Sequence, residues 1–350
     1  MDFTFDETQD AVRDLAAQIF QGQADVARVK EIEASDDRID RTLWSELAKA
    51  DLLGLVLPEA HGGGGLGMVE LALVLREQGR VVAPVPLVTT VVAALAIAEH
   101  GTAEQQAAWL PGVIAGDVVL SLALDRHPAT PPVTASGGAL TGTVLSVPYG
   151  HLADRVLVSA DDGVYLVDPA AAERQVAVAT DRSKVAHLTF AGTPAERLGD
   201  DRVAAWLLDR YRTGLAALQV GVCEAALAMA AEYTSNRNQF GRPLSTNQGV
   251  ALRAADAYID IRAIDATLWQ AAWRLDEGLD ATKAALVAKW WASDGGQRVV
   301  HATQHLHGGM GADIDYPVHR YFLWGKTIEQ TLGGPAQQLS VLGAALAEAK

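Results

Sequence analysis

The segment Arg237-Asn-Gln-Phe-Gly-Arg-Pro-Leu joins two long stretches of helical periodicity. It places a guanidinium, an amide and an aromatic ring close together along the chain. A guanidinium pairs with a pyrophosphate, an amide bonds a ribose or a base, and an aromatic ring packs on a flat face. The same residues also fit a charged turn between helices that is capped by Gly241. The segment therefore allows two interpretations, a grip on a dinucleotide and a plain inter-helix turn.

The periodicity around this segment divides the chain into three regions. Residues 1–116 carry apolar residues at helical intervals, broken by loops rich in Gly and Pro, which predicts an α-helical domain. Residues 117–199 carry short β-rich runs such as Arg155–Ser159, at spacings typical of a small sandwich or barrel. Residues 200–350 return to long helical segments joined by short loops, near 202–235, 245–276, 280–306 and 336–347. We therefore predict an α+β multidomain fold that ends in a four-helix bundle.

Composition excludes several classes of function. The net charge of −15 repels nucleic acid, so a partner of that kind is not expected. The single cysteine, Cys223, cannot form an internal disulfide and fits a reducing compartment. The N-terminal stretch Met1–Glu7 is acidic and lacks the basic-then-apolar order of a signal peptide. We therefore expect a cytoplasmic protein.

One uncharged stretch is long enough to suggest a membrane span. It runs from Val81 to Ala98, but Pro84 and Pro86 divide it into a loop and a helix of about 12 residues. A span needs roughly 20 residues, so we expect a buried core helix and no membrane association.

Three local motifs resemble known sites but lack a required part. His61-Gly-Gly-Gly resembles a hydrolase oxyanion loop, yet the chain has no Gly-x-Ser-x-Gly nucleophile turn. His301 and His305 have zinc-site spacing, but Ala302 stands where the catalytic version has Glu, and no third ligand is evident. Gly308-Gly-Met-Gly lacks Rossmann spacing and follows a helix. We therefore expect no hydrolase, no metal site and no Rossmann site.

Several longer blocks share one resemblance. The chain resembles the acyl-CoA dehydrogenase family from end to end, with the blocks in the family's order. The blocks are Leu43-Trp-Ser-Glu-Leu-Ala, Leu53-Gly-Leu-Val-Leu-Pro-Glu, Gly101-Thr-Ala-Glu-Gln-Gln, Gly150-His-Leu-Ala-Asp-Arg-Val-Leu-Val, Arg237-Asn-Gln-Phe-Gly, His307-Gly-Gly-Met-Gly and Asp315-Tyr-Pro-Val-His-Arg.

The resemblance implies a chemistry and a cofactor. Members bind FAD at a dimer interface and desaturate acyl-CoA thioesters between Cα and Cβ. A glutamate removes the α-proton while the β-hydride passes to flavin N5, and an acceptor such as electron-transfer flavoprotein takes the electrons. By position, the residues that the resemblance assigns to FAD are Arg237, Gln239, Phe240, Asn247, Gln248, His305, Gly308 and Gly309. The segment from Arg237 to Phe240 reaches the FAD of the neighbouring subunit in the family, and His305 replaces a usual Gln.

The flavin-ring and catalytic motifs depart from the family. Leu124-Asp-Arg-His-Pro-Ala-Thr-Pro stands where the family has Thr-Glu-Pro, and Ser146-Val-Pro where it has an aromatic-Ile-Thr motif. The catalytic Glu-Gly-Thr reads Leu332-Gly-Gly, and the alternative position before Arg212 holds Tyr211. No catalytic residue is therefore assigned to this chain.

The retained and lost motifs together predict a division of labour. The chain resembles the glutamate-lacking subunit of actinobacterial heterotetrameric steroid-CoA dehydrogenases, whose unlike subunits share a reduced number of FAD sites. We expect it to complete an FAD site with a sister subunit that bears the glutamate. Two alternatives stay open: a homo-oligomeric dehydrogenase with a displaced base, Asp209 or Glu329, and a non-catalytic structural subunit.

Overall fold

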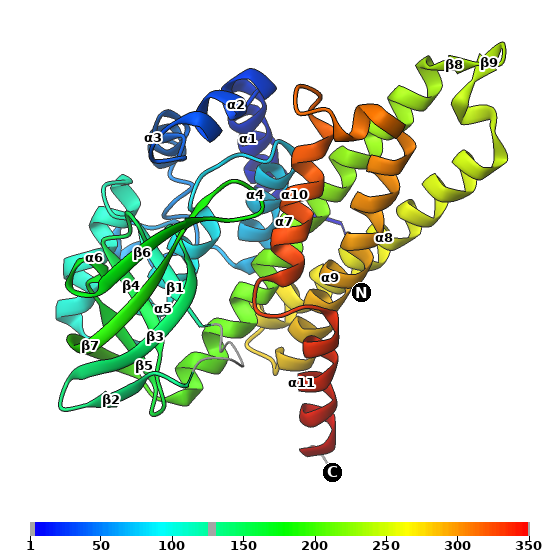
Figure 1. Cartoon of the computed structure of the whole chain (residues 1–350). Helices are drawn as coiled ribbons and strands as arrows, with labels where there is room; N and C mark the ends of the chain where they lie inside the picture. The colour runs from blue at the N-terminus through cyan, green and yellow to red at the C-terminus, as the bar shows by residue number, and fades with distance from the viewer. Residues whose placement is uncertain (1–3, 125–130, 349–350) are drawn as a thin grey trace.

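The computed structural model describes residues 4–124 and 131–348. Figure 1 shows the sheet at the left, the C-terminal helices at the right and the N-terminal helices above and behind the sheet. The predicted order of helices, sheet and helices is confirmed. The domain boundaries at residues 116 and 199 stay a prediction.

The N-terminal region is helical. Side-chain caps begin several of its helices, and a capping box between Asp6 and Gln9 starts the first. Its apolar helix α5 is buried along nearly its whole length, which confirms the core-helix interpretation of the uncharged stretch from Val81 to Ala98. The helices are α1 (Glu7–Gln23), α2 (Val26–Ala34), α3 (Arg41–Lys49), η1 (Glu59–His61, a 3-10 turn), α4 (Met68–Arg80), α5 (Leu87–His100) and α6 (Ala103–Ala115).

The middle region is a seven-stranded sheet in the order β1-β4-β5-β7-β3-β2, with β6 paired to β7. The long strand β7 pairs with β3 and β6 through its first part and with β5 through its end. Ser121 Oγ donates a hydrogen bond to the carbonyl of Pro148, so β1 lies against the end of β3 and the sheet curls around its own core. The strands are β1 (Leu120–Ala123), β2 (Thr134–Ser136), β3 (Ala139–Pro148), β4 (Arg155–Ser159), β5 (Val164–Val167), β6 (Glu173–Val178) and β7 (Lys184–Gly199), with the 3-10 turn η2 (Pro169–Ala171).

The C-terminal region consists of helices that pack on one another and on α4. The longest, α7, is capped by Asp200 and runs for 36 residues. By length and composition it could cross a membrane, but 67% of its apolar window is buried inside the protein. The elements are α7 (Asp201–Asn236), β8 (Asn238–Gln239), β9 (Arg242–Pro243), η3 (Leu244–Thr246), α8 (Gln248–Asp276), α9 (Thr282–Leu306), η4 (Gly308–Ala312), α10 (Val318–Gln330) and α11 (Pro335–Glu348).

Helix α10 was not among the helical segments expected from periodicity. Its sequence, Val318-His-Arg-Tyr-Phe-Leu-Trp, is crowded with β-branched and aromatic residues, which have modest helix propensity. Packing of Tyr321 and Ile328 into the core supplies the stability that the local sequence lacks.

Helices α4 and α7 cross at very short range. A Cβ added at Gly79 would stand 2.2 Å from the carbonyl oxygen of Leu218, and one at Gly221 would stand 2.0 Å from that of Arg76. Only glycine at both positions permits this approach. The crossing fixes the N-terminal region on the C-terminal helices.

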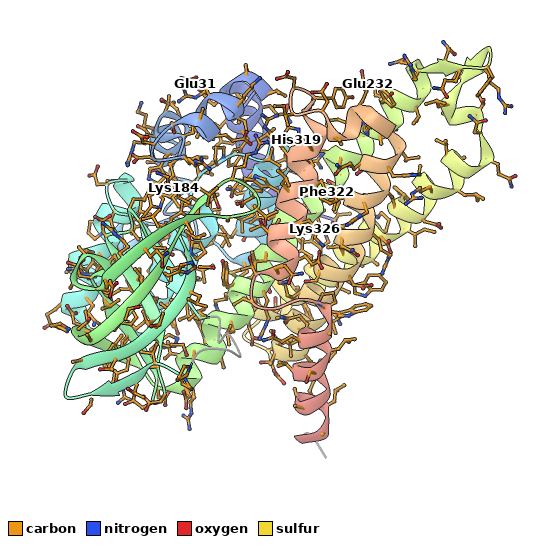
Figure 2. The ribbon with its side chains drawn as sticks, in the orientation of Figure 1. Glu31, Lys184, Glu232, His319, Phe322 and Lys326 are labelled. Atoms are coloured by element: carbon orange, nitrogen blue, oxygen red, sulfur yellow. The ribbon has the colours of Figure 1, made fainter. Side chains whose placement is uncertain are left out.

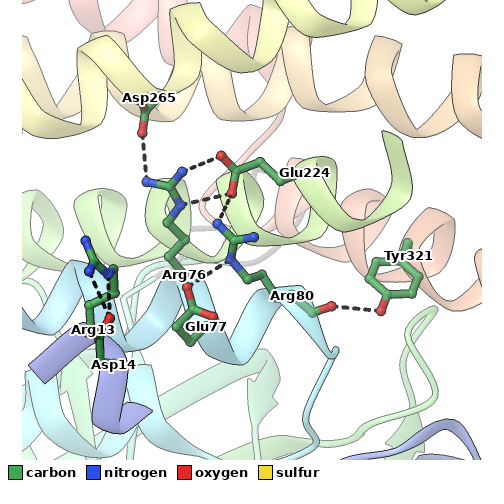
Figure 3. Close-up of polar contacts among 8 residues, drawn as sticks. All are labelled: Arg13, Asp14, Arg76, Glu77, Arg80, Glu224, Asp265 and Tyr321. Atoms are coloured by element: carbon green, nitrogen blue, oxygen red, sulfur yellow. Dashed lines mark hydrogen bonds and ion pairs between the residues drawn. The ribbon is translucent and has the colours of Figure 1, made fainter. Parts of the chain in front are cut away.

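A charge network closes the same crossing, as Figure 3 shows. Glu224 of α7 accepts from Arg76 and, at 2.6 Å, from Arg80. Arg76 also reaches Asp265 of α8 at 3.3 Å. Burial lowers the pKa of Arg76, but Glu224 and Asp265 outweigh it and hold that pKa above its ordinary value. The network therefore joins α4, α7 and α8 through paired charges.

We predict that Glu224→Gln lowers the free energy of unfolding by about 2 kcal/mol, because Arg76 then keeps only its contact with Asp265 and Arg80 only its pair with Glu77. The estimate stays below that for a fully buried pair, because the side chain of Arg80 is 36% exposed. Asp14→Asn is the control, since its pair with Arg13 is exposed and contributes about 0–1 kcal/mol. Urea unfolding of both variants measures the difference, and equal midpoints would contradict the prediction.

Candidate functional site

Residues 237–244 form a hairpin between α7 and α8. Strands β8 and β9 pair Gln239 with Arg242, and Phe240 and Gly241 between them have φ of 52° and 80°. This pair of left-handed residues makes the tight turn. The Arg237 amide donates to the Tyr233 carbonyl at 2.8 Å, so the hairpin continues directly from α7. Figure 1 shows it standing out beyond the body of the molecule.

The predicted FAD residues of the hairpin face outward. Arg237 and Gln239 are exposed, and the Phe240 side chain is fully exposed at 101%. Within residues 4–124 and 131–348, no ion pair involves Arg237. An arginine, an amide and a ring that are held out in this way are available to a group outside the chain.

Asn247 and Gln248 lie at the base of the hairpin and differ in how far their side chains are available to bind a cofactor. The Asn247 side chain accepts from Arg242 Nη2 at 2.8 Å and donates to the Leu244 carbonyl at 3.0 Å. It therefore stabilises the turn. Gln248, the first residue of α8, is exposed.

His305, Gly308 and Gly309 are exposed at the end of α9, where Gly308 has a φ of 59°. The ring of His307 lies 4.8 Å from that of Tyr233, which precedes Arg237 by one helical turn. Figure 2 labels Glu232, the neighbour of Tyr233, on the part of α7 that leads into the hairpin. The structure therefore brings the end of α9 beside α7, while the hairpin tip extends away from both.

Exposed apolar side chains continue from the hairpin along α8. Leu252 and Ile259 are seven residues apart, hence on one face, and are 58% and 63% exposed. Tyr258 is also 58% exposed. Helix α11 shows a similar pair, Leu339 and Leu346. Exposed apolar side chains that share a helix face make α8 and α11 candidates for a protein–protein interface.

The two positions that the resemblance assigns to a catalytic base hold buried residues that are not acidic. Leu332 is 6% exposed with a φ of 62°, and Gln338 Nε2 donates to its carbonyl at 2.5 Å. Tyr211 is 4% exposed on α7. Neither position can supply a carboxylate.

The two weak candidates for a displaced base are engaged elsewhere. Asp209 accepts from Thr282 Oγ1 at 2.7 Å and from Arg212 Nη1 at 3.3 Å. Burial raises its pKa, but both of its oxygens have partners. Glu329 is bonded to Lys326 at 2.5 Å and to Gln330 at 3.0 Å.

Ser146-Val-Pro, which replaces the second flavin-ring motif, and the adjacent Tyr149 make contacts within this chain. The Ser146 amide donates to His187 Nδ1 at 3.0 Å. Tyr149 OH lies 3.4 Å from the Val85 carbonyl of the N-terminal region, and burial raises its pKa. Ser146 and Tyr149 both have positive φ, a conformation that non-glycine residues adopt at a cost. The first replaced motif spans residues 124–131, and its residues 125–130 lie outside the described residues.

The turn between β6 and β7 bridges all three regions, which sequence reasoning missed. The Asp181 amide donates to Thr327 Oγ1 of α10 at 3.1 Å. Arg182 pairs with Glu33 of α2 at 2.9 Å, and Glu33 also accepts two hydrogen bonds from the buried Arg320 of α10. No local pattern could reveal these contacts, because Glu33 and Arg320 are 287 residues apart in sequence.

The zinc-like histidine pair and the loop after His61 are explained by packing and by a tight turn. His301 packs edge-on against Phe322 at 4.8 Å, and Figure 2 labels Phe322 on α10. In the described part of the chain no group of three His, Cys, Asp or Glu could hold a metal ion. Gly63 lies against the carbonyl of Leu57, where a Cβ would stand 2.2 Å away, so that glycine permits a tight loop. Cavities of about 270 and 610 Å³ are lined by residues other than the predicted FAD contacts.

Comparison with known proteins gives the family. The model of the acyl-CoA dehydrogenase N-terminal domain matches residues 6–117, and that of the C-terminal domain matches residues 202–347. Acyl-CoA dehydrogenase FadE27 of Mycobacterium tuberculosis is 39% identical over 99% of both chains. The chain belongs to the acyl-CoA dehydrogenase family. FAD is the cofactor of this family of oxidoreductases, and the expected resemblance is confirmed.

Solved acyl-CoA dehydrogenase structures agree with the fold. A variant of the Tcur3481–Tcur3483 steroid ACAD is similar with 48% identity and a TM-score of 0.94, over 98% of each chain. The ChsE4–ChsE5 complex from Mycobacterium tuberculosis is similar with 38% identity and a TM-score of 0.95, over 99% of each chain. Butyryl-CoA dehydrogenase from Megasphaera elsdenii is 25% identical with a TM-score of 0.87, covering 99% of this chain and 100% of that one.

We predict that the hairpin contributes little to the stability of its own chain. Arg237→Ala and Phe240→Ala should each change the free energy of unfolding by less than about 0.5 kcal/mol, because both side chains are exposed. Phe190→Ala is the control: this ring is 1% exposed in the sheet core, and its loss should cost about 3–5 kcal/mol. A hairpin variant as unstable as the control would show that the hairpin serves its own fold.

Proposed function

We propose that this chain is one subunit of a heteromeric, FAD-dependent acyl-CoA dehydrogenase and completes an FAD site on a homologous subunit that carries the catalytic glutamate. The observation that carries the proposal is an asymmetry. The predicted FAD contacts of the hairpin and of the α9 end are intact and mostly exposed, whereas Leu332 and Tyr211 fill the family's base positions inside the core.

The exposed residues suit an FAD held by another subunit. Arg237 would pair with the pyrophosphate, Gln239 would bond a ribose or base, and Phe240 would cover a flat face. His305 and the Gly308–Gly309 turn would lie on the adenosine side. When bound, FAD supplies the acceptor for the hydride that leaves Cβ. In this chain the residues bind and orient, and they move no proton.

Proton abstraction falls to the partner. The α-proton of a thioester requires a base within hydrogen-bond reach, and a carboxylate serves when an apolar pocket raises its pKa. In this chain Asp209 and Glu329 are held by Thr282, Arg212, Lys326 and Gln330. The turn at Asp181 and Arg182 also ties the sheet to α10 and α2. Because Asp209 and Glu329 are both engaged, their contacts favour a base on the partner over a displaced base in this chain.

The partner is proposed to be a homologous sister subunit in a heterotetramer. The exposed apolar faces of α8 and α11 need a cover. One similar solved structure is the ChsE4–ChsE5 complex, and another carries two names, Tcur3481–Tcur3483. The latter is called a steroid ACAD, which supports a steroid-type acyl-CoA as substrate. We also propose a cytoplasmic location and electron-transfer flavoprotein as acceptor.

Arg237→Ala in the co-expressed complex tests the cofactor role. We expect the FAD dissociation constant to rise about tenfold or more, because a charge-assisted contact contributes about 1.5–3 kcal/mol. Arg202→Ala is the control, since this exposed arginine lies at the other end of α7. Fluorescence titration of the apo-complex measures both. Unchanged FAD affinity in Arg237→Ala would support a purely structural subunit instead.

Amide variants of the candidate bases distinguish the alternatives. We expect Asp209→Asn and Glu329→Gln in the complex to retain desaturation within about threefold, whereas loss of a true base slows proton abstraction by orders of magnitude. Single-turnover reduction of the flavin by an acyl-CoA measures the step. A loss of about a thousandfold or more in either variant would place the base in this chain.

A further inference from the structure

Three aromatic rings meet where the two parts of the predicted FAD surface join. Tyr233 comes from α7, His307 from the end of α9 and Tyr316 from the loop before α10. The rings of Tyr233 and His307 are stacked with centroids 4.8 Å apart, and those of His307 and Tyr316 are 5.2 Å apart. Tyr233 and Tyr316 also meet edge to face at 6.3 Å. We call these residues the aromatic cluster.

His307 is the central and most buried part of the aromatic cluster. It is 2% exposed, and its Nδ1 lies 2.7 Å from the Thr303 carbonyl one turn earlier on α9. A carbonyl only accepts, so Nδ1 carries the proton in this bond. Burial lowers the pKa of His307, although the carbonyls of Thr303 and Met229 oppose that shift. Burial therefore favours the neutral form of the ring over the charged form.

Each flank of His307 leads into a predicted cofactor contact. Gly308 follows it directly and turns the chain at a φ of 59°. On the other flank, the Tyr233 carbonyl accepts from the Arg237 amide at 2.8 Å, and the Arg237 carbonyl accepts from the Leu244 amide at 2.9 Å. The stack on Tyr233 connects the His307 ring to the start of the hairpin. The bond from Nδ1 to the Thr303 carbonyl fixes the same ring at the end of α9, beside the glycine turn.

We propose that His307 is a positioning residue, which holds the Arg237 hairpin and the Gly308–Gly309 turn at a fixed separation so that both grip one FAD. The proposal rests on the proposed function above. His307 touches no cofactor in this account and acts through its two flanks. Its two attachments can be removed separately: Phe keeps the ring and loses the bond to Thr303, whereas Asn keeps a donor and loses the ring.

The test is a double-mutant cycle on FAD affinity in the co-expressed complex. We expect His307→Ala to raise the FAD dissociation constant about tenfold, and His307→Phe and His307→Asn about threefold each. In an Arg237→Ala background, where the hairpin no longer contributes its guanidinium, His307→Ala should have a clearly smaller effect. His100→Ala is the control and should leave FAD affinity unchanged, because this half-buried ring at the end of α5 meets Trp206 of α7 and no predicted FAD contact.

The outcomes separate the two proposals. If His307→Ala and His307→Phe leave the dissociation constant unchanged while Arg237→Ala raises it, the positioning role is wrong and the proposed function stands. If His307→Ala has the same effect in both backgrounds, the residue acts through general stability, and the positioning role is again wrong. If Arg237→Ala has no effect, the proposed function fails. Should His307→Ala not fold, the Phe and Asn variants complete the same cycle.

Discussion

The close crossing of α4 and α7 is the constraint on which the rest of the structure depends. Gly79 and Gly221 let the two backbones meet, and Glu224 then collects Arg76 and Arg80 at the same place. Because α7 is fixed there through its buried middle, its far end can project as a rigid helix. The hairpin is therefore displayed beyond the body of the molecule by a helix that belongs to the core.

Because of this crossing, the chain has two kinds of position, those buried in its own core and those exposed on the projecting hairpin. Inward-facing positions are determined by packing. Leu332 and Tyr211, at the positions that the resemblance assigns to a base, are buried, and the turn at Asp181 and Arg182 bonds to α10 and α2. Outward-facing positions are free of such demands. Arg237, Gln239 and Phe240 cost the fold little, and their residue types are suited to binding a dinucleotide, as proposed. The proposed division of labour between subunits accounts for both.

The sequence predicted the fold class because the helical and strand periods are clear and the family blocks occur in order. The assignment of Leu332 and Tyr211 to the family's base positions rests on the resemblance and stays a prediction. The sequence could not show that Asn247 is bonded to Arg242 and Leu244, because residue type does not reveal the partner. The bonds of Glu33 to Arg182 and Arg320 join distant segments and leave no local pattern. Helix α10 was missed because its stability comes from packing.

The ratio of FAD to protein in the purified complex tests the central claim most directly. The chain and its glutamate-bearing partner would be co-expressed and saturated with FAD, and bound flavin would be compared with the amount of each chain. The account predicts one FAD for each pair of unlike chains and none on this chain alone. One FAD for every chain, or stoichiometric FAD on this chain alone, would contradict it.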